Sequence, residues 1–291
     1  MQVSITALNT NFAAMLQLGQ FQQLKILRET DPGLFLGNEE GDEVLLPHKY
    51  KPDGYSIGDT LEAFVYLDHE ERPIATTLEP EIRLNQFAYL RCSDVNKFGA
   101  FMDWGLEKQL FVPFKEQARP MKVGNWYVVY LYLDEKTNRL AASSKTQRFL
   151  DNEELTINKF DEVEILVTHI TDKGANVIIN GKHKGLIYLE DIFEDIRSGD
   201  RMQAFVKKIR HDNKVDIVLQ SPGYRSIEPN ANYVLEELKA AGGFMPLHDK
   251  SDPEDIKNEL GISKKSFKKA IGSLYKDKRI LIRENGIELV E

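Results

Sequence analysis

Hydrophobic and polar positions alternate along most of the first 220 residues, in short runs broken by glycine, asparagine and charged residues. This period of two is typical of short antiparallel strands with one face in a core. The clearest run extends from Trp126 to Leu133 and follows a Val-Gly-Asn turn. The pattern therefore predicts small β-sheets over the N-terminal three quarters of the chain.

The same β pattern occurs three times, and a pair of glycines 25 residues apart marks each copy. The pairs are Gly33 and Gly58, Gly99 and Gly124, and Gly174 and Gly199. Offsets of 66 and 75 residues superimpose the copies without gaps, from the first glycine to the strand after the second. Three copies of one all-β unit explain this shared phase better than chance glycine spacing does.

The middle copy carries the strongest chemical signal. Phe98 and Phe101 flank a Gly-Ala pair, and Trp104 follows three residues later. Flat rings at such positions can stack on nucleobases, although alternation alone does not tell which strand face is the core. Candidate phosphate contacts in this copy are Lys97, Arg139 and Lys145.

Residues 98–143 resemble the S-one RNA-binding motif in several places. These are Phe-Gly-Ala-Phe at 98–101, Phe-Val-Pro at 111–113, Val-Gly-Asn at 123–125, and Asp134 followed by Arg139-Leu140-Ala141-Ala142-Ser143. The resemblance implies a five-stranded OB-type barrel of roughly 70 residues, in which rings on the second and third strands stack on bases. It departs from the family at Pro113, where a histidine is usual.

The outer copies differ in their rings and charges. In the first copy only Phe35 stands at a corresponding ring position, and acidic residues fill the turn at 39–43, so we expect a structural or protein-contact barrel. In the third copy Lys173 and Asn176 replace the two phenylalanines, while Tyr188 occupies the usual histidine position. Its candidate nucleic-acid contacts are Lys184, Tyr188, Lys207 and Lys208.

After Pro222 the hydrophobic period changes to 3.6, which indicates helices. The pattern predicts helices at 232–241, from Pro253 to Gly261 with Asp252 as N-cap, and from Lys264 to about Lys278 with Ser263 as N-cap. A hairpin with an Asn-Gly turn follows at 280–290. This order predicts a winged helix whose third helix is in the recognition position.

One face of that third helix is almost purely basic, opposite the apolar face of Phe267 and Leu274. We expect this face to contact nucleic acid, and a merely solvated surface is the alternative. The candidate residues are Lys264, Lys265, Lys268, Lys269, Lys276 and Arg279.

The predicted fold is mainly β with a small α+β domain: three tandem OB-fold, five-stranded barrels followed by a winged helix. We predict a disordered extension at residues 1–18, barrels at 19–80, 81–150 and 151–222, and the winged helix at 223–291. This order, together with the run from Pro253 to Lys276, resembles the bacterial conserved virulence factor B family. The resemblance implies an RNA-binding protein that influences expression of virulence and surface-protein genes.

Composition narrows the class of protein. Of 291 residues, 42% are hydrophobic and 29% charged, and no apolar run approaches the roughly 20 residues needed to span a bilayer. Residues 1–14 lack the features of a signal peptide, and a single cysteine, Cys92, suits a reducing compartment. We therefore expect a cytoplasmic protein without membrane contact.

The net charge of −8 does not suggest a nucleic-acid-binding protein, but its distribution does. Residues 19–77 carry a net charge of −7, residues 86–145 carry +3 and residues 263–283 carry +7. Because affinity for a polyanion depends on local positive charge, the middle repeat and the third helix are the candidate binding regions.

The six histidines are scattered without metal-ligand spacing, and no nucleophile–base set can be singled out, so we expect no enzymatic activity, metal or cofactor. The leading hypothesis is a protein that binds single-stranded RNA and regulates genes after transcription. Two alternatives stay open: a DNA-binding regulator acting through the winged helix, and a protein-interaction scaffold acting through the acidic first repeat.

Overall fold

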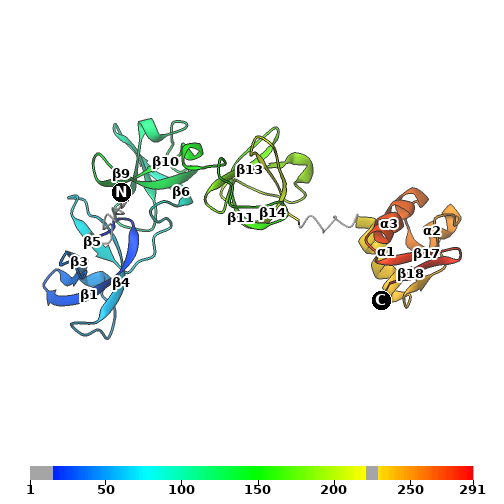
Figure 1. The fold of residues 1–291 in the computed structure, drawn as a ribbon, viewed down its shortest axis with the longest axis horizontal. Helices are drawn as coiled ribbons and strands as arrows, with labels where there is room; N and C mark the ends of the chain where they lie inside the picture. Colours follow the sequence, from blue (N-terminus) through cyan, green and yellow to red (C-terminus); the bar gives the residue numbers. More distant parts are fainter. Residues whose placement is uncertain (1–15, 221–228, 291) are drawn as a thin grey trace, which may run out of the picture.

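The computed structural model describes residues 16–220 and 229–290, which form three groups of five strands and a winged helix (Figure 1). Barrel one contains β1 (Gln20–Thr30), β2 (Gly33–Gly37), β3 (Glu43–Pro47), η1 (His48–Tyr50), β4 (Thr60–Leu67) and β5 (Pro73–Thr76). Barrel two contains β6 (Phe87–Val95), β7 (Gly99–Asp103), β8 (Leu110–Pro113), η2 (Phe114–Glu116), β9 (Trp126–Asp134) and β10 (Arg139–Ser143), followed by η3 (Thr146–Phe149). Barrel three contains β11 (Glu162–Thr171), β12 (Gly174–Ile179), β13 (His183–Tyr188), η4 (Leu189–Asp191), β14 (Arg201–Ile209) and β15 (Val215–Val218).

Barrels one and three are closed by a short parallel pairing of their third and fifth strands. Leu45 pairs with Ile74 in barrel one, and Gly185 pairs with Val215 in barrel three. Barrel two has the strand order β10-β9-β6-β7-β8, so β8 and β10 remain the two edges of its sheet. The predicted series of three five-stranded units is confirmed. In the middle unit β8 and β10 lie side by side, as the closing strands of the other two units do, but no strand ladder joins them.

The repeated glycines have two different physical roles. At the first glycine of each pair, a Cβ atom would lie within 2.4 Å of a carbonyl oxygen on the neighbouring strand. These close approaches are to Leu46 at Gly33, to Val112 at Gly99 and to Ile187 at Gly174. The second glycines have φ angles of 101°, 85° and 99°, a region that L side chains rarely adopt. The 66- and 75-residue offsets therefore follow from backbone geometry.

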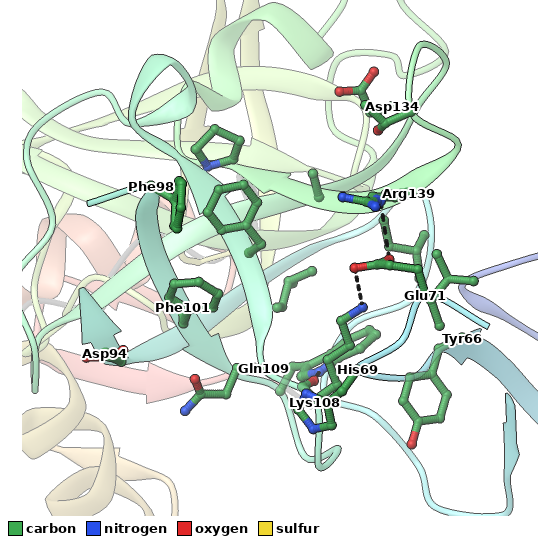
Figure 2. A pocket seen from close by; sticks show the side chains of 18 of the residues that line it. Tyr66, His69, Glu71, Asp94, Phe98, Phe101, Lys108, Gln109, Asp134 and Arg139 are labelled. Atoms are coloured by element: carbon green, nitrogen blue, oxygen red, sulfur yellow. Dashed lines mark hydrogen bonds and ion pairs between the residues drawn. The ribbon is translucent and has the colours of Figure 1, made fainter. Parts of the chain in front are cut away.

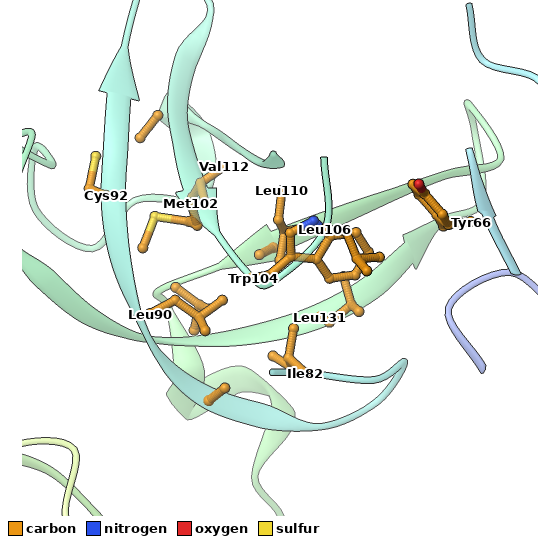
Figure 3. Packing of buried hydrophobic residues seen from close by; sticks show 14 of the residues in the cluster. Tyr66, Ile82, Leu90, Cys92, Met102, Trp104, Leu106, Leu110, Val112 and Leu131 are labelled. Carbon is orange, nitrogen blue, oxygen red and sulfur yellow. The ribbon is translucent and has the colours of Figure 1, made fainter. Parts of the chain in front are cut away.

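Trp104 joins barrels one and two. It lies in the loop after β7, is only 2% exposed, and packs edge-on against Phe64 and Tyr66 of β4, with ring centroids 5.9 and 6.2 Å away. Its indole N–H donates a hydrogen bond to the carbonyl of Lys108. Burial raises the pKa of Tyr66 well above its usual value. Figure 3 shows Trp104 among the core side chains of barrel two, so the two barrels share one hydrophobic core.

A second interface, separate from the core shared by barrels one and two, joins barrels two and three. Phe87 of β6 and Leu166 of β11 belong to one buried cluster, and the Arg201 guanidinium donates to the carbonyl of Phe87. The ring of Tyr89 occupies the space where Gly199 has no Cβ, since an added Cβ would lie 2.1 Å from it. Barrel two is therefore held on both sides, between barrel one and barrel three (Figure 1).

The C-terminal unit is a winged helix made of α1 (Pro229–Ala240), β16 (Phe244–Met245), α2 (Pro253–Leu260), α3 (Lys264–Lys276), β17 (Ile280–Arg283) and β18 (Gly286–Leu289). Asp252 and Ser263 accept hydrogen bonds from the first turns of α2 and α3, as predicted, and Gly261 ends α2 with a φ of 66°. These caps set the helix boundaries that the sequence indicated.

Two details of the hairpin differ from the prediction. Arg283 pairs with Gly286, so the turn residues are Glu284 and Asn285, and Gly286 already belongs to β18. Its missing side chain makes room for β16, because a Cβ there would lie 2.2 Å from the carbonyl oxygen of Met245. Two-residue β16 has too short a pattern to be predicted from the sequence.

The predicted N-terminal extension also needs correction. Leu16 and Leu18 are partly buried against the core of barrel one, so the expectation of a disordered segment up to residue 18 is wrong for these residues. Residues 1–15 lie outside the described residues. The domain bounds proposed from the sequence remain predictions.

We predict that Trp104→Ala lowers the free energy of unfolding of the protein by about 3–5 kcal/mol, because it empties a large, fully packed site in the shared core. Denaturant unfolding followed by circular dichroism measures this change. Phe98→Ala is the matched control, since that ring is 62% exposed and its removal leaves no cavity. An unchanged unfolding midpoint for Trp104→Ala would show that the two barrels do not share a core.

Phe160 occupies an unfavourable backbone conformation. Its φ is 76°, and its N–H bonds to Val206, as the N–H groups of Gly19 and Asn85 bond to Val65 and Leu131. Gly19 and Asn85 have φ angles of 79° and 63° at this same repeat position. Glycine and asparagine adopt this region readily, whereas a bulky residue is strained there. The Phe160 ring is 58% exposed, so little packing offsets that strain.

We therefore expect Phe160→Asn to raise the free energy of unfolding by about 1 kcal/mol through relief of backbone strain. Thermal and denaturant unfolding of the variant would measure it. The reciprocal change, Asn85→Phe, should destabilise barrel two, and it also removes the acceptor for the Tyr130 hydroxyl. Loss of stability in Phe160→Asn would mean that the exposed ring makes contacts that outweigh the strain.

Candidate nucleic-acid interface

The three barrels present the same strand face with different side chains on it. In barrel one the guanidinium of Arg28 lies 4.2 Å from the centroid of the Phe35 ring. Arg28 also donates two hydrogen bonds to the Glu43 carboxylate, at 2.7 and 2.6 Å. The only ring predicted for this face is therefore covered by an ion pair.

Barrel three is covered in a similar way. Arg210 donates to the Tyr188 hydroxyl, and its guanidinium pairs with the buried Asp216 carboxylate at 2.6 Å. The hydrogen bond to Asp216 raises the pKa of Arg210. Because Arg210 holds the Tyr188 hydroxyl and is itself paired with Asp216, the Tyr188 ring is less available for stacking than its sequence position suggested.

Barrel two lacks such a cover. Asp94 and Gln109 occupy the positions that Arg28 and Glu43 have in barrel one, at the same β-bulge and register. The Phe101 ring is half-buried against Phe111, with centroids 5.3 Å apart and planes at 40°. Phe98 is exposed, and the Lys97 ammonium lies 5.0 Å from its ring centroid. These rings leave an aromatic surface open to solvent.

A groove of about 710 Å³ extends from this aromatic surface over β8 and β10 (Figure 2). One wall comes from β8, with Phe111 and Pro113, and the other from β10, with Arg139 and Ala141. No strand ladder joins β8 to β10, although the two strands lie side by side. The feature that distinguishes barrel two from its neighbours thus lies beside its aromatic surface.

The far end of the groove is formed by barrel one, which the sequence did not indicate. The turn after β4 brings Glu71 between two cations of barrel two, as Figure 2 shows. Its carboxylate lies 3.0 Å from Lys108 Nζ and 3.3 Å from Arg139 Nε. Lys108 also donates to the carbonyl of Asp68 at 2.7 Å. Alternation patterns carry no signal for a contact between a turn of one repeat and a strand of the next.

The structure places the other predicted residues of barrels two and three as follows. The prediction that Trp104 stacks on a base is wrong, because its ring is buried in the core shared by barrels one and two. Arg139 pairs with the Glu71 carboxylate through its Nε atom, and Lys207 pairs with Asp191 at 2.6 Å. The exposed residues Lys145, Lys184 and Lys208 form no ion pair within the described part of the chain.

On the winged helix, α3 presents lysines opposite its buried apolar side, as predicted. Lys265, Lys268, Lys269 and Lys276 are exposed, while Lys264 is half-buried and approaches the carbonyl of Lys250. Arg279 lies beyond the helix, which ends at Lys276, and its backbone N–H bonds to Leu274. The exposed Tyr275 adds an aromatic ring next to Lys276.

Residues 16–220 and 229–290 contain neither a cluster of side chains that could hold a metal ion nor a helix that could span a membrane. In these ranges no group of three or more histidine, cysteine, aspartate or glutamate side chains could hold a metal ion. Within the same residues no helix is both long and apolar enough to cross a membrane.

Two segments match protein-family models. Residues 232–289 match the CvfB-like winged helix domain, and residues 18–78 match the S1 domain. Among solved structures, the chain is similar to a crystal structure described as a multidomain protein with nucleic acid binding domains from Streptococcus pneumoniae TIGR4. The identity is 28%, the similarity covers 94% of this chain and 98% of that chain, and the TM-score is 0.44.

The chain also matches several proteins over almost its whole length. The chain is 30% identical over 281 residues to uncharacterized protein YitL of Bacillus subtilis, covering 92% of both proteins. It is 25% identical to conserved virulence factor B of Staphylococcus saprophyticus, covering 94% of this chain and 95% of that protein. The corresponding protein of Staphylococcus aureus USA300 is 23% identical, covering 94% of each.

Proposed function

The chain belongs to the conserved virulence factor B family, and on this premise we propose that it is a non-catalytic, cytoplasmic protein that binds single-stranded RNA. Bases stack on Phe98 and Phe101 of barrel two, and phosphates contact lysines on barrel two and on α3. Through such binding the protein regulates gene expression after transcription, and its relatives' name points to virulence genes.

The uncovered rings of barrel two are the observation that carries this proposal. Base stacking needs an exposed flat ring and depends little on sequence, because every base has a π-face. Phe35 and Tyr188 are engaged by arginines that themselves pair with carboxylates, whereas Phe98 is open and lies beside Lys97. The groove over β8 and β10 gives a splayed base somewhere to enter.

The winged helix supports a second candidate, binding of duplex DNA. Its basic α3 is the helix that winged-helix proteins place in the major groove. A single winged helix contacts few phosphates. We therefore propose that the winged helix adds electrostatic affinity for RNA, while barrel two makes the base contacts.

We predict that the full chain binds a single-stranded RNA more tightly than a DNA duplex of the same length, since a duplex hides the faces on which rings stack. Fluorescence anisotropy titrations of both at one salt concentration measure the difference. A duplex that bound equally or more tightly would favour the DNA-binding alternative.

Two sets of variants separate stacking from charge. Changing Phe98 and Phe101 to Ala should weaken RNA binding by about 1–3 kcal/mol per unstacked base and leave the salt dependence nearly unchanged. Changing Lys265, Lys268 and Lys276 to Gln should instead flatten the slope of log affinity against log salt, by roughly 0.7 for each phosphate that is no longer neutralised.

Unfolding midpoints must be measured beside affinity, because Phe101 also packs against Phe111. Phe98→Ala alone serves as the variant that keeps the packing intact. If the stably folded double phenylalanine variant binds RNA as the unmodified protein does, the stacking surface is not used.

A further inference from the structure

A second pair of rings lies on barrel two outside the groove. Trp126, the first residue of β9, stacks on Tyr89 of β6, with ring centroids 5.4 Å apart and planes at 28°. Neither ring belongs to the groove lining. Trp126 is 49% exposed. Tyr89 therefore covers part of the indole, and a large part of it stays open to solvent.

The barrel fold does not require a ring at this position. The same register positions are occupied by Thr60 in barrel one and by Arg201 in barrel three. Arg201 serves the interface between barrels, where it donates to the carbonyl of Phe87 and pairs with Glu164. Because both neighbours fold without an aromatic residue here, and a half-exposed indole gains only part of the free energy of burial, Trp126 is suited to binding.

Strand register places Trp126 on the same outer sheet face as Phe101. Side chains alternate between the two faces of a strand, and on β7 Met102 lies in the core while Phe101 and Asp103 lie on the outer face. Asp103 is opposite Arg91 on β6, and Arg91 is opposite Trp126 on β9. At ordinary strand spacing Trp126 lies roughly 12 Å from Phe101, two strands across and two residues along.

Arg91 lies between the two sets of rings and is available to a phosphate. It is exposed and forms neither an ion pair nor a side-chain hydrogen bond with another described residue, while the neighbouring Asp103 accepts from the N–H of Gly105. Lys122 is also exposed and begins the turn that leads into β9, where the Asn125 N–H donates to its carbonyl at 3.2 Å. Cations beside exposed rings favour a polyanion that carries bases over an apolar partner.

The second ring pair lies at the boundary with barrel three. Tyr89 occupies the space beside Gly199. Burial and the nearby Asp200 carboxylate raise the pKa of Tyr89, which keeps its phenol uncharged next to a polyanion. One OB fold holds about 4–16 nucleotides, so a bound strand extends beyond the two phenylalanines of barrel two. The outer face of the sheet gives that extension a continuous surface.

We propose that Trp126 and Arg91 form a second RNA contact, in which one base stacks on Trp126 and a phosphate contacts Arg91. The strand then runs from Phe98 and Phe101 across the outer face of β7, β6 and β9 to barrel three. The inference rests on the proposed function and adds a binding site outside the groove.

Tryptophan fluorescence tests whether a base reaches Trp126, because stacking on a base quenches indole emission. The chain has two tryptophans, and the other one, Trp104, is only 2% exposed. Titration of the full chain with 12-nucleotide oligouridine should therefore quench the emission of the unmodified protein. Trp126→Phe, whose remaining emission comes from Trp104, should show no quenching.

Fluorescence anisotropy with the same RNA measures the contribution to affinity. Trp126→Leu keeps an apolar side chain without a flat face and should bind about tenfold more weakly, as expected for one unstacked base. Trp126→Phe should lie between this variant and the unmodified protein. Arg91→Gln should flatten the slope of log affinity against log salt by roughly 0.7. Phe193→Leu is the control, because this 69% exposed ring lies on a loop with Glu190 and Glu194, and it should leave binding unchanged.

Melting temperatures measured beside each titration show which variants are folded. Full-strength binding by a folded Trp126→Leu variant would overturn the inference and leave the stacking to Phe98 and Phe101. Weaker binding without quenching in the unmodified protein would also overturn it, since Trp126 would then act only through the packing of Tyr89. If the unmodified protein does not bind the oligomer at all, the proposed function itself fails.

Discussion

Burial of Trp104 between Phe64 and Tyr66 is the contact on which the candidate site depends. It holds barrel one against barrel two, and it therefore sets where the turn containing Glu71 meets the face formed by β8 and β10. A surface ion pair of this kind is worth little by itself, so Glu71 cannot hold the barrels together. The apolar core positions the charges, and the charges in turn define one end of the groove.

Barrel two differs from its neighbours where the groove lies. In barrels one and three a short parallel pairing joins the third and fifth strands, and covered rings lie on the same face. In barrel two β8 and β10 lie side by side without that pairing, and Phe111 and Arg139 line the groove over them. Shared cores with both neighbours add to the stability of the middle unit from outside its own barrel.

Much of the fold could be predicted because single residues determine its local geometry. Gly99 lies too close to a neighbouring carbonyl oxygen for a residue with a Cβ atom, and Asp252 and Ser263 accept hydrogen bonds from N–H groups at the starts of helices. Each of these positions requires a particular residue type, so it can be recognised in the sequence. Trp104 and Glu71 escaped prediction for a different reason. Whether a ring packs inward, and which turn touches which strand of another repeat, depends on contacts distant in sequence that alternation does not encode. The covers on Phe35 and Tyr188 belong to the same class.

The contact between Glu71 and barrel two also changes how the acidic first repeat is interpreted. A net charge of −7 over residues 19–77 suggested a barrel that avoids nucleic acid and contacts protein instead. Charge summed over a repeat describes long-range attraction, which salt screens within about 10 Å, whereas recognition of a base is decided by one or two groups at contact distance. Glu71 lies between Lys108 and Arg139 of barrel two, so its negative charge is balanced at contact distance. The acidity of barrel one is therefore compatible with the nucleic-acid binding that we propose for barrel two.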